Sequence, residues 1–408
     1  MAIVGGGPAG LAAAVELRRR GVGDVVVIDR EAEAGGIPRH AQHQGFGLRD
    51  LRRPLSGPAY ARRHVELARR AGAELLLETM VTGFTPDGAL ELTGPGGRST
   101  LEPAAVVLAT GCRERPRSAR LVPGSRPDGV MTTGMLQQLV YLQRLPAGRQ
   151  ALVVGAEHVS FSAIMTLAHG GARTVALTTE LERHQSLAAF RLGALARYRV
   201  PVWTRTRVSA IHGRPRVEEV ELTDLAGGGT RTVACDTVVF SDDWIPDHEL
   251  AVMAGLELDP LTRGPAVDAA LRTSSPGVFG AGNVLHGAEQ ADVAALSGRH
   301  VAGAVARYLA DGAWPARRVP LRCAPPLGWI APNALTEGAG DPSRGRFALR
   351  SRELLRAPRI EIAQGERVLW SGRVARVMPG RSARLPAGWT RDVDPAGEPV
   401  VCRPGRPG

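Results

Sequence analysis

The chain has 408 residues, of which 44% are hydrophobic, and a formal net charge of +11 at pH 7. This length predicts two or three globular domains, and the hydrophobic content is sufficient for their cores. The basic side chains other than histidine are all arginine, and they are scattered through every segment. A nucleic-acid-binding protein is expected to gather its positive charge on one face, with aromatic residues between the charges. The composition therefore favours a solvated arginine-rich surface and no nucleic-acid partner, with an anionic partner as the alternative.

Cysteine usage and hydropathy indicate a cytoplasmic protein. The four cysteines are Cys112, Cys235, Cys323 and Cys402. They form no C-x-x-C pair, so the sequence signals no redox dithiol, iron–sulfur cluster or zinc site. Isolated, reduced thiols are typical of the cytoplasm. The sequence has no apolar run long enough to cross a bilayer and no signal peptide, so we also expect no membrane partner.

The first segment carries the pattern of a dinucleotide-binding loop. After the apolar residues 1–4 come Gly5, Gly7 and Gly10, spaced as G-x-G-x-x-G, and a helical pattern follows. A second apolar strand over residues 25–28 then ends at Asp29. Glycines at this spacing permit a tight turn, let a pyrophosphate approach the backbone, and let the helix pack on the strand. Since the acid falls about 20 residues after the loop, the segment predicts a nucleotide site with Asp29 on the ribose hydroxyls.

Further segments favour FAD as the nucleotide. Gly35 and Gly36 closely follow Asp29, and a strand over residues 105–108 ends in Ala109, Thr110 and Gly111. Small residues at a strand end allow a cofactor to lie close to the backbone. Far downstream, another strand leads into a Gly-Ala-Gly turn, Asn283 and a long helix.

These motifs resemble the pyridine nucleotide-disulfide oxidoreductase superfamily, flavoproteins with two dinucleotide-binding domains, over about residues 1–315. The resemblance implies that FAD is bound and that the Gly282–Asn283 region contacts its pyrophosphate and ribityl chain, where the family normally has Asp. The residues expected at the FAD are Gly5, Gly7, Pro8, Ala9, Gly10, Asp29, Arg30, Gly36, Arg39, Val81, Ala109, Thr110, Gly111, Gly282, Asn283 and Val293.

A second copy of the loop lies at the position where this family binds NAD(P)H. Gly155 matches Gly5, but the next two loop positions are Glu157 and Ser160, and a following strand ends near Glu180. A side chain in place of the second glycine obstructs the backbone approach, and its carboxylate repels a pyrophosphate. We therefore expect a degenerate nucleotide-like site and doubtful NAD(P)H binding. The alternative is that Glu157 points to solvent and NADH binds through Glu180.

A narrower resemblance concerns the chemistry. The segment from residue 109 to residue 156 is similar to the flavin subunits of hydrogen cyanide synthase, opine oxidase and sarcosine oxidase alpha type, but redox cysteines are lacking. It implies oxidation of a small amine, amino acid or hydroxy compound by hydride transfer to flavin, with a partner that is a second flavoprotein or a ferredoxin-like chain. One alternative is an NAD(P)H-dependent flavin reductase feeding a partner. The other is a nucleotide-binding scaffold subunit of a larger dehydrogenase.

Two histidines are candidate catalytic residues. His40 lies where the chain leaves the ribose site and turns toward the flavin, and His286 follows Asn283. Histidine can exchange protons near neutral pH. For both residues, a purely structural position in a polar loop is the alternative.

The expected fold class is α/β, with two Rossmann-like domains, the second inserted in the first, plus a small β-rich C-terminal module. We place the FAD-binding domain at 1–115 and 241–315, the NAD(P)-binding-like domain at 116–240, and the module at 316–408. Within the module, the Pro-rich residues 317–333 predict a linker or loop, and the alternating residues 359–389 predict strands. The last residues, 402–408, are expected to be disordered.

Overall fold

The computed structural model describes residues 1–186, 192–193, 196–287 and 289–405, and it divides the chain into two compact units. The first unit consists of Met1–Arg39, Gln44–Cys112 and Pro246–Gly408, and the second of His40–His43 and Arg113–Ile245. The second unit is thus inserted in the sequence of the first. The C-terminal segment belongs to the first unit.

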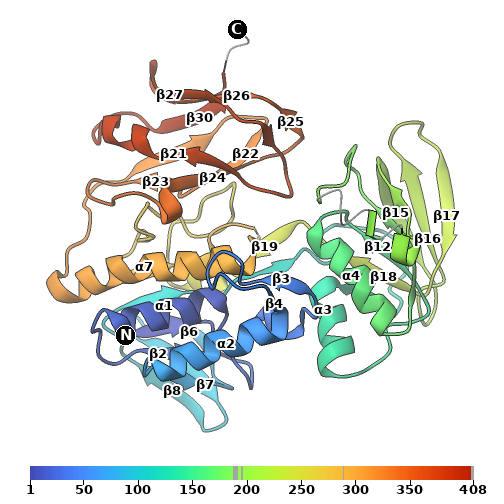
Figure 1. The fold of residues 1–408 in the computed structure, drawn as a ribbon, viewed down its shortest axis with the longest axis horizontal. Coiled ribbons are helices and arrows are strands. Elements are labelled where there is room, and N and C mark those ends of the chain that lie inside the picture. The colour runs from blue at the N-terminus through green and yellow to red at the C-terminus, as the bar shows by residue number, and fades with distance from the viewer. Residues whose placement is uncertain (187–191, 194–195, 288, 406–408) are drawn as a thin grey trace. The chain divides into compact units, whose positions relative to one another are not determined.

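The first unit is built on a five-stranded sheet in the order β20-β9-β1-β2-β5, in which every neighbouring pair is parallel. Its strands are β1 (Ala2–Val4), β2 (Val26–Ile28), β5 (Glu74–Leu76), β9 (Val106–Leu108) and β20 (Val278–Gly280). The helices are α1 (Pro8–Arg19), α2 (Gly57–Arg70), α6 (Glu249–Met253) and α7 (Ala291–Asp311). The central strands are short apolar runs buried on both faces, as expected for parallel strands covered by helices. Figure 1 shows α1 and α7 running side by side.

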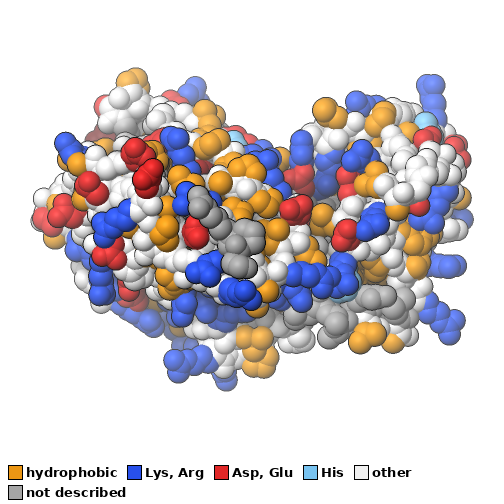
Figure 2. All heavy atoms as spheres, turned by 90° about the horizontal axis from the view of Figure 1, so that it is seen from above, with side chains coloured by type: hydrophobic (Ala, Val, Ile, Leu, Met, Phe, Trp, Pro, Cys, Tyr) orange, Lys and Arg blue, Asp and Glu red, His pale blue; other side chains and the backbone are white. Residues whose placement is uncertain are grey.

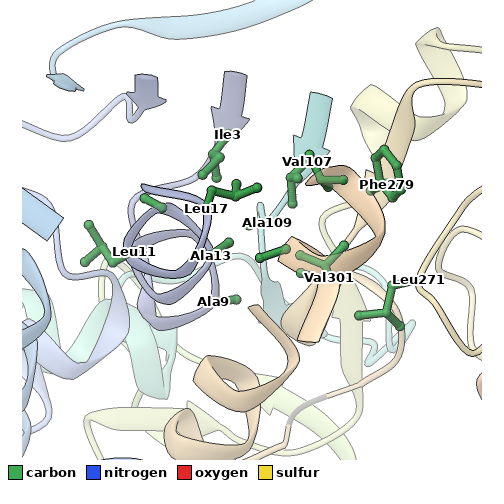
Figure 3. Packing of buried hydrophobic residues seen from close by; sticks show 14 of the residues in the cluster. Ile3, Ala9, Leu11, Ala13, Leu17, Val107, Ala109, Leu271, Phe279 and Val301 are labelled. Atoms are coloured by element: carbon green, nitrogen blue, oxygen red, sulfur yellow. The ribbon is translucent and has the colours of Figure 1, made fainter. Parts of the chain in front are cut away.

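The core of this sheet is filled by small and branched apolar side chains. Figure 3 shows Ile3 and Val107 from the sheet close to Leu17 and Ala13 of α1, with Val301 of α7 beside them. The two helices approach closely because α7 has a glycine at the crossing. A Cβ on Gly298 would overlap the backbone carbonyl of Ala9. This contact fixes the start of α1, where the first glycine loop lies.

Shorter elements complete the first unit. Before its C-terminal segment, the first unit has the antiparallel sheets β6-β7-β8 and β3-β4. Their strands are β3 (Gln44–Phe46), β4 (Leu55–Ser56), β6 (Met80–Phe84), β7 (Leu90–Gly94) and β8 (Gly97–Leu101), and the short 3-10 helices are η1 (Ile37–His40) and η3 (Gly282–Val284). Val81 of β6 is buried and belongs to the same apolar cluster as Val4 and Ile28.

The second unit repeats the parallel design in the order β11-β18-β12-β13-β14. These strands are β11 (Val130–Thr132), β12 (Gln150–Val154), β13 (Arg173–Thr178), β14 (Val202–Trp203) and β18 (Thr237–Phe240). An antiparallel sheet follows with β15 (Thr206–His212), β16 (Glu219–Asp224) and β17 (Thr230–Ala234). The helices are α3 (Thr133–Gln137), the π-helical η2 (Gln138–Leu142) and α4 (His158–His169), and β10 (Cys112–Glu114) pairs with β19 (Trp244–Pro246).

The C-terminal segment of the first unit is made of strands. They form the sheets β23-β21-β30-β26-β27, β22-β24-β29 and β25-β28. Their bounds are β21 (Val319–Cys323), β22 (Leu327–Ala331), β23 (Ala334–Leu335), β24 (Arg346–Ser351), β25 (Leu355–Arg356), β26 (Arg359–Gln364), β27 (Arg367–Arg373), β28 (Arg376–Val377), β29 (Ala383–Pro386) and β30 (Val400–Pro404), with η4 (Ser343–Gly345) and η5 (Gly388–Asp392) between them. Figure 1 shows these strands gathered together in orange and red.

Two sequence expectations for this segment are wrong. Residues 317–333 are not a linker, because β21 and β22 lie there and Leu321, Leu327 and Ile330 are buried in the core of the segment. The end of the chain is not disordered from residue 402 onward, because β30 reaches Pro404 and buries Cys402 completely. Residues 406–408 lie outside the described part. In both places, apolar side chains at alternating positions are buried in a core, and the flanking prolines and glycines give no sign of this in the sequence.

The surface carries both signs of charge. Figure 2 shows blue arginine side chains spread over the visible face and interleaved with acidic and apolar ones. Within the part of the chain that the structure describes, no helix combines the length and apolar character needed to cross a bilayer.

Candidate functional site

The first glycine loop connects β1 to α1 and needs glycine for steric reasons. Gly5 has φ +111°, and a Cβ there would overlap the backbone carbonyl of Ala109 at the end of β9. A Cβ on Gly10 would overlap the carbonyl oxygen of Gly5 itself. These two glycines therefore keep the loop folded tightly against the neighbouring strand and helix.

Gly7 differs from those two glycines, because a Cβ there would meet nothing closer than the Cα of Gly36 at 4.0 Å. Gly7 is the N-cap of α1, no side chain caps the helix, and Pro8 occupies the first turn. The backbone amides of the first turn therefore have no side-chain acceptor, in a helix that also carries no acidic residue there. Free amides at a helix N-terminus, with open space in front of the loop, form a cradle for an anion.

Asp29 stands at the carboxyl end of β2 and is tied to the same loop. Its Oδ2 accepts a hydrogen bond from the backbone N–H of Gly6 at 2.7 Å, and its Oδ1 accepts one from the N–H of Glu31 at 2.9 Å. Each carboxylate oxygen retains a further lone pair. The side chain is thus held in one orientation and can still accept ribose hydroxyls. The neighbouring Arg30 is exposed, and its Nε lies 4.0 Å from Oε1 of Glu31.

Arg39 borders the turn formed by Gly35 and Gly36. Its guanidinium donates to the backbone carbonyl of Glu33 and lies 3.7 Å from the Glu31 carboxylate. Its Nε is buried and has no hydrogen-bond partner among the described residues. A buried, unsatisfied N–H on a cation is costly unless an acceptor arrives. This orphaned donor, together with the open cradle at Gly7, fits a pyrophosphate-containing cofactor such as FAD.

The end of β9 contributes the small residues that the sequence analysis singled out. Ala109 donates its backbone N–H to Val4, which keeps the ends of β9 and β1 together. Thr110 Oγ1 donates to the carbonyl of Asp247 at 2.7 Å, and the carbonyl of Gly111 accepts the N–H of Asp247 at 3.0 Å. The Thr110 side chain and the Gly111 carbonyl are therefore both engaged with the backbone of Asp247.

The loop that follows β20 is held closed by hydrogen bonds among its own residues and by one to α7. Gly282 has φ +77° and packs against Ala9, and its N–H donates to Ser297 of α7. The Asn283 side chain clamps the loop from within: its Oδ1 accepts the Glu289 N–H at 3.0 Å, and its Nδ2 donates to the Glu289 carbonyl at 3.2 Å. Asn283 therefore has a clear structural role, whereas its contact with a cofactor remains a prediction.

His286 lies within that closed loop and packs against the C-terminal strands. Its ring stacks on Trp329 of β22 with centroids 4.7 Å apart and an interplanar angle of 21°. Its Nδ1 lies 3.1 Å from the carbonyl oxygen of Gly287. Burial lowers the pKa of His286, and this exceeds the opposite effect of the Glu289 carboxylate. The imidazole is therefore neutral at pH 7, and with Nδ1–H donating to Gly287, Nε2 is the basic nitrogen.

Glu289 is the anionic group of this loop. Burial alone would raise the pKa of Glu289, but Arg384 and Arg350 hold it below its usual range. The Arg384 guanidinium lies 3.2 Å from the Glu289 carboxylate, and Arg350 lies over the Trp329 ring at 5.1 Å. Glu289 Oε1 is buried without a hydrogen-bond partner among the described residues. The His286 loop and the C-terminal strands thus enclose a polar cluster with one unused acceptor.

The start of α7 adds a charge pair that the sequence analysis missed. Asp292 in the first turn is buried, and its Oδ2 lies 3.1 Å from the Arg49 guanidinium. Arg49 also donates its backbone N–H to Asp292 and its guanidinium to Gln290. Val293 follows in the same turn and lines a small cavity of about 60 Å³ with His286. The ion pair fixes the loop around Arg49 to the start of α7.

His40 has a different setting from His286. It ends η1, is buried, and belongs to the second compact unit, whereas His286 belongs to the first. The structure therefore gives no basis for treating the two histidines as one catalytic pair.

The second glycine loop has its key residues at the same spacing as the first, but a buried carboxylate takes the place of the second glycine. Gly155 has φ +134°, and α4 has the same length of 12 residues as α1. Glu157 is the N-cap of α4, and its side chain is buried. Its Oε2 accepts the Val159 N–H at 2.7 Å, and its Oε1 accepts the Ser160 N–H at 3.1 Å and the Ser241 hydroxyl at 2.7 Å. The alternative in which Glu157 points to solvent is therefore wrong.

The carboxyl group of Glu157, which we call the plug of the second loop, has a raised pKa. Burial raises the pKa of Glu157 to about 7, and the nearby Asp242 carboxylate acts in the same direction. The hydrogen bonds from Val159 and Ser241 oppose this effect. The carboxylate thus accepts hydrogen bonds from two first-turn amides of α4, the groups that bind anions at helix N-termini in general. Ser160 completes a reciprocal capping box, because the Glu157 N–H lies 3.3 Å from its hydroxyl.

Glu180, the acid expected at the end of the second unit's next strand, lies outside this buried network. It follows β13 after two residues, its side chain is 55% exposed, and it forms an ion pair with Arg207 at 2.8 Å. The strand end therefore presents an acid at the position expected from the sequence, but one already paired with an arginine.

Several residues of the site carry no recognisable sequence signal. Trp329, Arg350 and Arg384 come from strands that the sequence assigned to a linker or to a separate module. Ser241 is different, because it directly follows the buried strand β18, and residues at that edge of a parallel sheet meet the glycine loop. That position is a signal from which sequence reasoning could have found Ser241.

Together, two parallel βαβ sheets with glycine loops at their strand ends define a dinucleotide-binding α/β protein of the two-Rossmann type. The family model for pyridine nucleotide-disulphide oxidoreductases matches residues 1–298. The chain belongs to this family, whose members and relatives are flavin-dependent oxidoreductases, so that FAD is supported at the level of the family.

Several characterised proteins are similar in sequence. One component of the opine oxidase of Agrobacterium tumefaciens (strain Ach5) is 29% identical over 329 residues, which is 73% of this chain but only 63% of that component. Ferredoxin–NADP reductase of Salinispora arenicola (strain CNS-205) is 30% identical over 295 residues, 70% of this chain and 85% of that protein. Thioredoxin reductase of Treponema pallidum (strain Nichols) is 27% identical over 314 residues, 75% of this chain and 96% of that protein.

Solved structures show the same fold. Thioredoxin reductase of T. acidophilum has a TM-score of 0.63 at 21% identity and covers 76% of this chain and 98% of its own. An NAD-dependent persulfide reductase from A. fulgidus has a TM-score of 0.57 at 22% identity and covers 75% of this chain and 58% of its own. At such identities these likenesses concern the fold alone.

Proposed function

We propose that this chain is an FAD-dependent oxidoreductase that oxidises a small amine, amino acid or hydroxy compound, using neither a redox disulfide nor NAD(P)H. The observation that carries the proposal is the contrast between the two glycine loops. The first leaves the amides of α1 open, whereas the second fills those of α4 with the Glu157 carboxylate. Electrons therefore enter from a substrate other than a nicotinamide nucleotide.

FAD supplies the two-electron acceptor for such a reaction when it is bound. The residues proposed to hold it are the Gly5–Gly10 loop, Asp29, Arg39 and the ends of β9 and β20. The loop amides and Arg39 Nε would donate hydrogen bonds to the pyrophosphate oxygens, and Asp29 would accept hydrogen bonds from the ribose hydroxyls.

His286 is the proposed proton acceptor. Hydride loss from a carbon that bears an amine or hydroxyl requires removal of a proton from the nitrogen or oxygen. A buried imidazole that is neutral at pH 7, with Nε2 as the basic nitrogen, suits this task. Trp329 fixes the ring plane by stacking, and Glu289 stabilises the imidazolium that forms. His40 is a second candidate for proton transfer, independent of His286.

The test is an anaerobic titration of the flavin-loaded protein. We expect no bleaching of the flavin absorbance by NADH or NADPH, and bleaching by one member of a panel of amino acids, secondary amines and hydroxy acids. Dithionite serves as the positive control for a reducible flavin. Rapid bleaching by NADPH would refute the exclusion of nicotinamide nucleotides. If the wild type is not bleached, the variant Glu157→Gly tests the cause, because this variant should bind NADPH if the Glu157 side chain is what blocks the loop.

A second candidate is an NAD(P)H-dependent flavin reductase that feeds a partner protein. The similarity to ferredoxin–NADP reductase favours it, since that relative aligns across 85% of its own length. It requires NADPH to bind in spite of Glu157. The same titration decides between the two candidates.

The similarity to a component of opine oxidase supports a further proposal, that this chain works with another protein chain in the cytoplasm. The proposed partner is a second flavoprotein or a ferredoxin-like chain. In the extreme version of this proposal, the chain is a nucleotide-binding scaffold subunit of a larger dehydrogenase. If the isolated flavoprotein is reduced by no donor of the panel but regains activity when co-expressed with such a partner, the scaffold role is supported.

A further inference from the structure

The C-terminal strands bring together two cysteines that lie far apart in the sequence. Cys323 ends β21, and Cys402 lies in β30, the last strand of the chain. The two strands pair in parallel, and Cys323 and Cys402 are direct partners in that pairing. Both cysteines are free thiols. The expectation of isolated thiols is therefore wrong for this pair.

The geometry suits a covalent link. Neighbouring strands lie about 4.8 Å apart, and partner side chains on a parallel pair leave the sheet on the same face. Disulfides form between cysteines whose Cα atoms are about 4.4–6.8 Å apart. The Cys402 thiol is close enough to be the largest influence on the pKa of the Cys323 thiol, which it raises. Formation of the bond therefore requires rotation of side chains, without a change in strand pairing.

We propose that Cys323 and Cys402 form an oxidation-dependent disulfide that staples the first strand of the C-terminal segment to its last. The oxidant is a low-molecular-weight disulfide. The Cys323 thiolate attacks one sulfur and releases one thiol, and Cys402 then attacks the mixed disulfide on Cys323 and releases the second. Two protein thiols are oxidised, one small disulfide is reduced, and the two protons leave on the released thiols.

Cys323 reacts first because it is the more accessible of the two. Cys402 is fully buried, whereas Cys323 is partly exposed. The neighbouring Cys402 thiol and then burial raise the pKa of the Cys323 thiol. Since only the thiolate attacks, the reaction is slow at neutral pH and accelerates as the pH rises.

The staple matters because this segment covers the His286 loop. Trp329 stacks on His286 from β22, and Arg384 pairs with Glu289 from β29. A disulfide between β21 and β30 closes a covalent ring that includes β22 and β29. The ring removes conformational freedom from this segment in the unfolded protein. Oxidation therefore stabilises the strands that hold His286 and Glu289, whichever substrate the enzyme takes.

The test uses the full-length, flavin-loaded protein treated with oxidised glutathione at pH 8.5, then denatured and alkylated. We expect a mass lower by two hydrogens before alkylation, two of the four cysteines to escape alkylation, and one cross-linked peptide containing Cys323 and Cys402. A phosphine reductant should restore four alkylated cysteines. Four alkylated cysteines after oxidation, or a stable glutathione adduct on Cys323 alone, would overturn the proposal.

Variants separate the staple from general oxidation. Cys323→Ser should abolish the cross-link, and Cys112→Ala should leave it intact. The oxidised protein should unfold at a higher temperature than the reduced protein, with no such difference in Cys323→Ser. If Cys323→Ser fails to fold, the wild-type peptide map still decides whether the link forms. A cross-link without any shift in the unfolding temperature would contradict the stabilising role.

Discussion

The two glycine loops of this chain share their spacing and differ in what occupies the helix N-terminus. In the first, Gly7 caps α1 without a side chain, and a Cβ on Gly7 would have room. In the second, Glu157 caps α4 and accepts hydrogen bonds from two amides and from the Ser241 hydroxyl. Both solutions satisfy the same physical demand, since the first-turn amides of a helix need acceptors. The second loop supplies the acceptor from its own sequence, and in our proposal the first loop takes it from the bound cofactor.

If the second unit binds no nucleotide, as we propose, this comparison indicates how the fold can be kept without its ligand. A capping box stabilises the helix start by itself, so the second unit gains stability from Glu157, the residue that we propose obstructs a pyrophosphate. The fold is maintained because Gly155 still provides the turn with φ +134°. Exchanging residues between the loops therefore tests which of them decide cofactor binding and which only hold the fold.

The largest effect is expected from moving the plug into the first loop with Gly7→Glu. A Cβ at Gly7 has room, so the protein should fold, yet its carboxylate would meet the cofactor pyrophosphate. The affinity for FAD should fall about a thousandfold, because two unit charges about 4 Å apart repel by ~4 kcal/mol at a partly buried site. Flavin titration of the apoprotein measures this. Gly7→Ala, which adds only the Cβ, should bind FAD much more tightly than Gly7→Glu, and equal losses in the two variants would argue against the charge.

The next effect is steric. Gly10→Ser gives the first loop the residue of the second, but its Cβ would overlap the carbonyl oxygen of Gly5. The backbone must shift, and overpacking of this kind costs about 3 kcal/mol. Urea unfolding of the purified variant, together with its flavin content, tests the prediction. The reverse exchange, Ser160→Gly, should cost less, since it removes only one half of a capping box; a larger loss from Ser160→Gly than from Gly10→Ser would contradict the account.

Sequence reasoning worked where local chemistry decides the structure. Gly5, Gly10 and Asp29 were identified because a tight turn and a strand-end acid leave a fixed spacing in the chain. It could not tell whether Glu157 turns outward or caps α4, because that depends on Ser241, which arrives from another strand. It failed for the C-terminal strands, where prolines suggested a linker although Leu321 completes a core.

The third prediction concerns the plug itself. Glu157→Ala leaves the amides of Val159 and Ser160 without their acceptor, so the second unit should lose about 1–2 kcal/mol of stability. The loss should be partly restored by millimolar NADPH or pyrophosphate if the vacated amides bind an anion. Thermal unfolding with and without these ligands measures both effects. A variant as stable as the wild type would mean that the hydrogen bonds of Glu157 contribute little.

The fourth prediction concerns pH. Burial raises the pKa of Glu157 from its usual 4.5 to about 7, so folding favours the protonated form. The associated stability is fully present below about pH 4.5 and is lost as the pH rises through about 7. Glu157→Gln should therefore flatten the decline in stability between pH 5 and pH 7 by on the order of 1 kcal/mol, as one pKa unit corresponds to about 1.4 kcal/mol. Burial also raises the pKa of Glu114 to about 7, so the double variant Glu114→Gln, Glu157→Gln should be flatter still. An unchanged slope in both variants would show that other groups set the pH dependence.

The smallest effect is expected at Glu180, the acid that the second unit places where the first has Asp29. Its ion pair with Arg207 is more than half exposed, and such pairs contribute about 0–1 kcal/mol. Glu180→Ala should therefore change the unfolding free energy by less than about 0.5 kcal/mol and leave flavin content unchanged. Asp29→Ala should instead weaken FAD binding, because it removes the acceptor for the Gly6 amide and for the ribose. If Glu180→Ala also alters a measurable NADPH affinity, the second loop still serves a nucleotide; if it does not, the acid at this strand end no longer serves one.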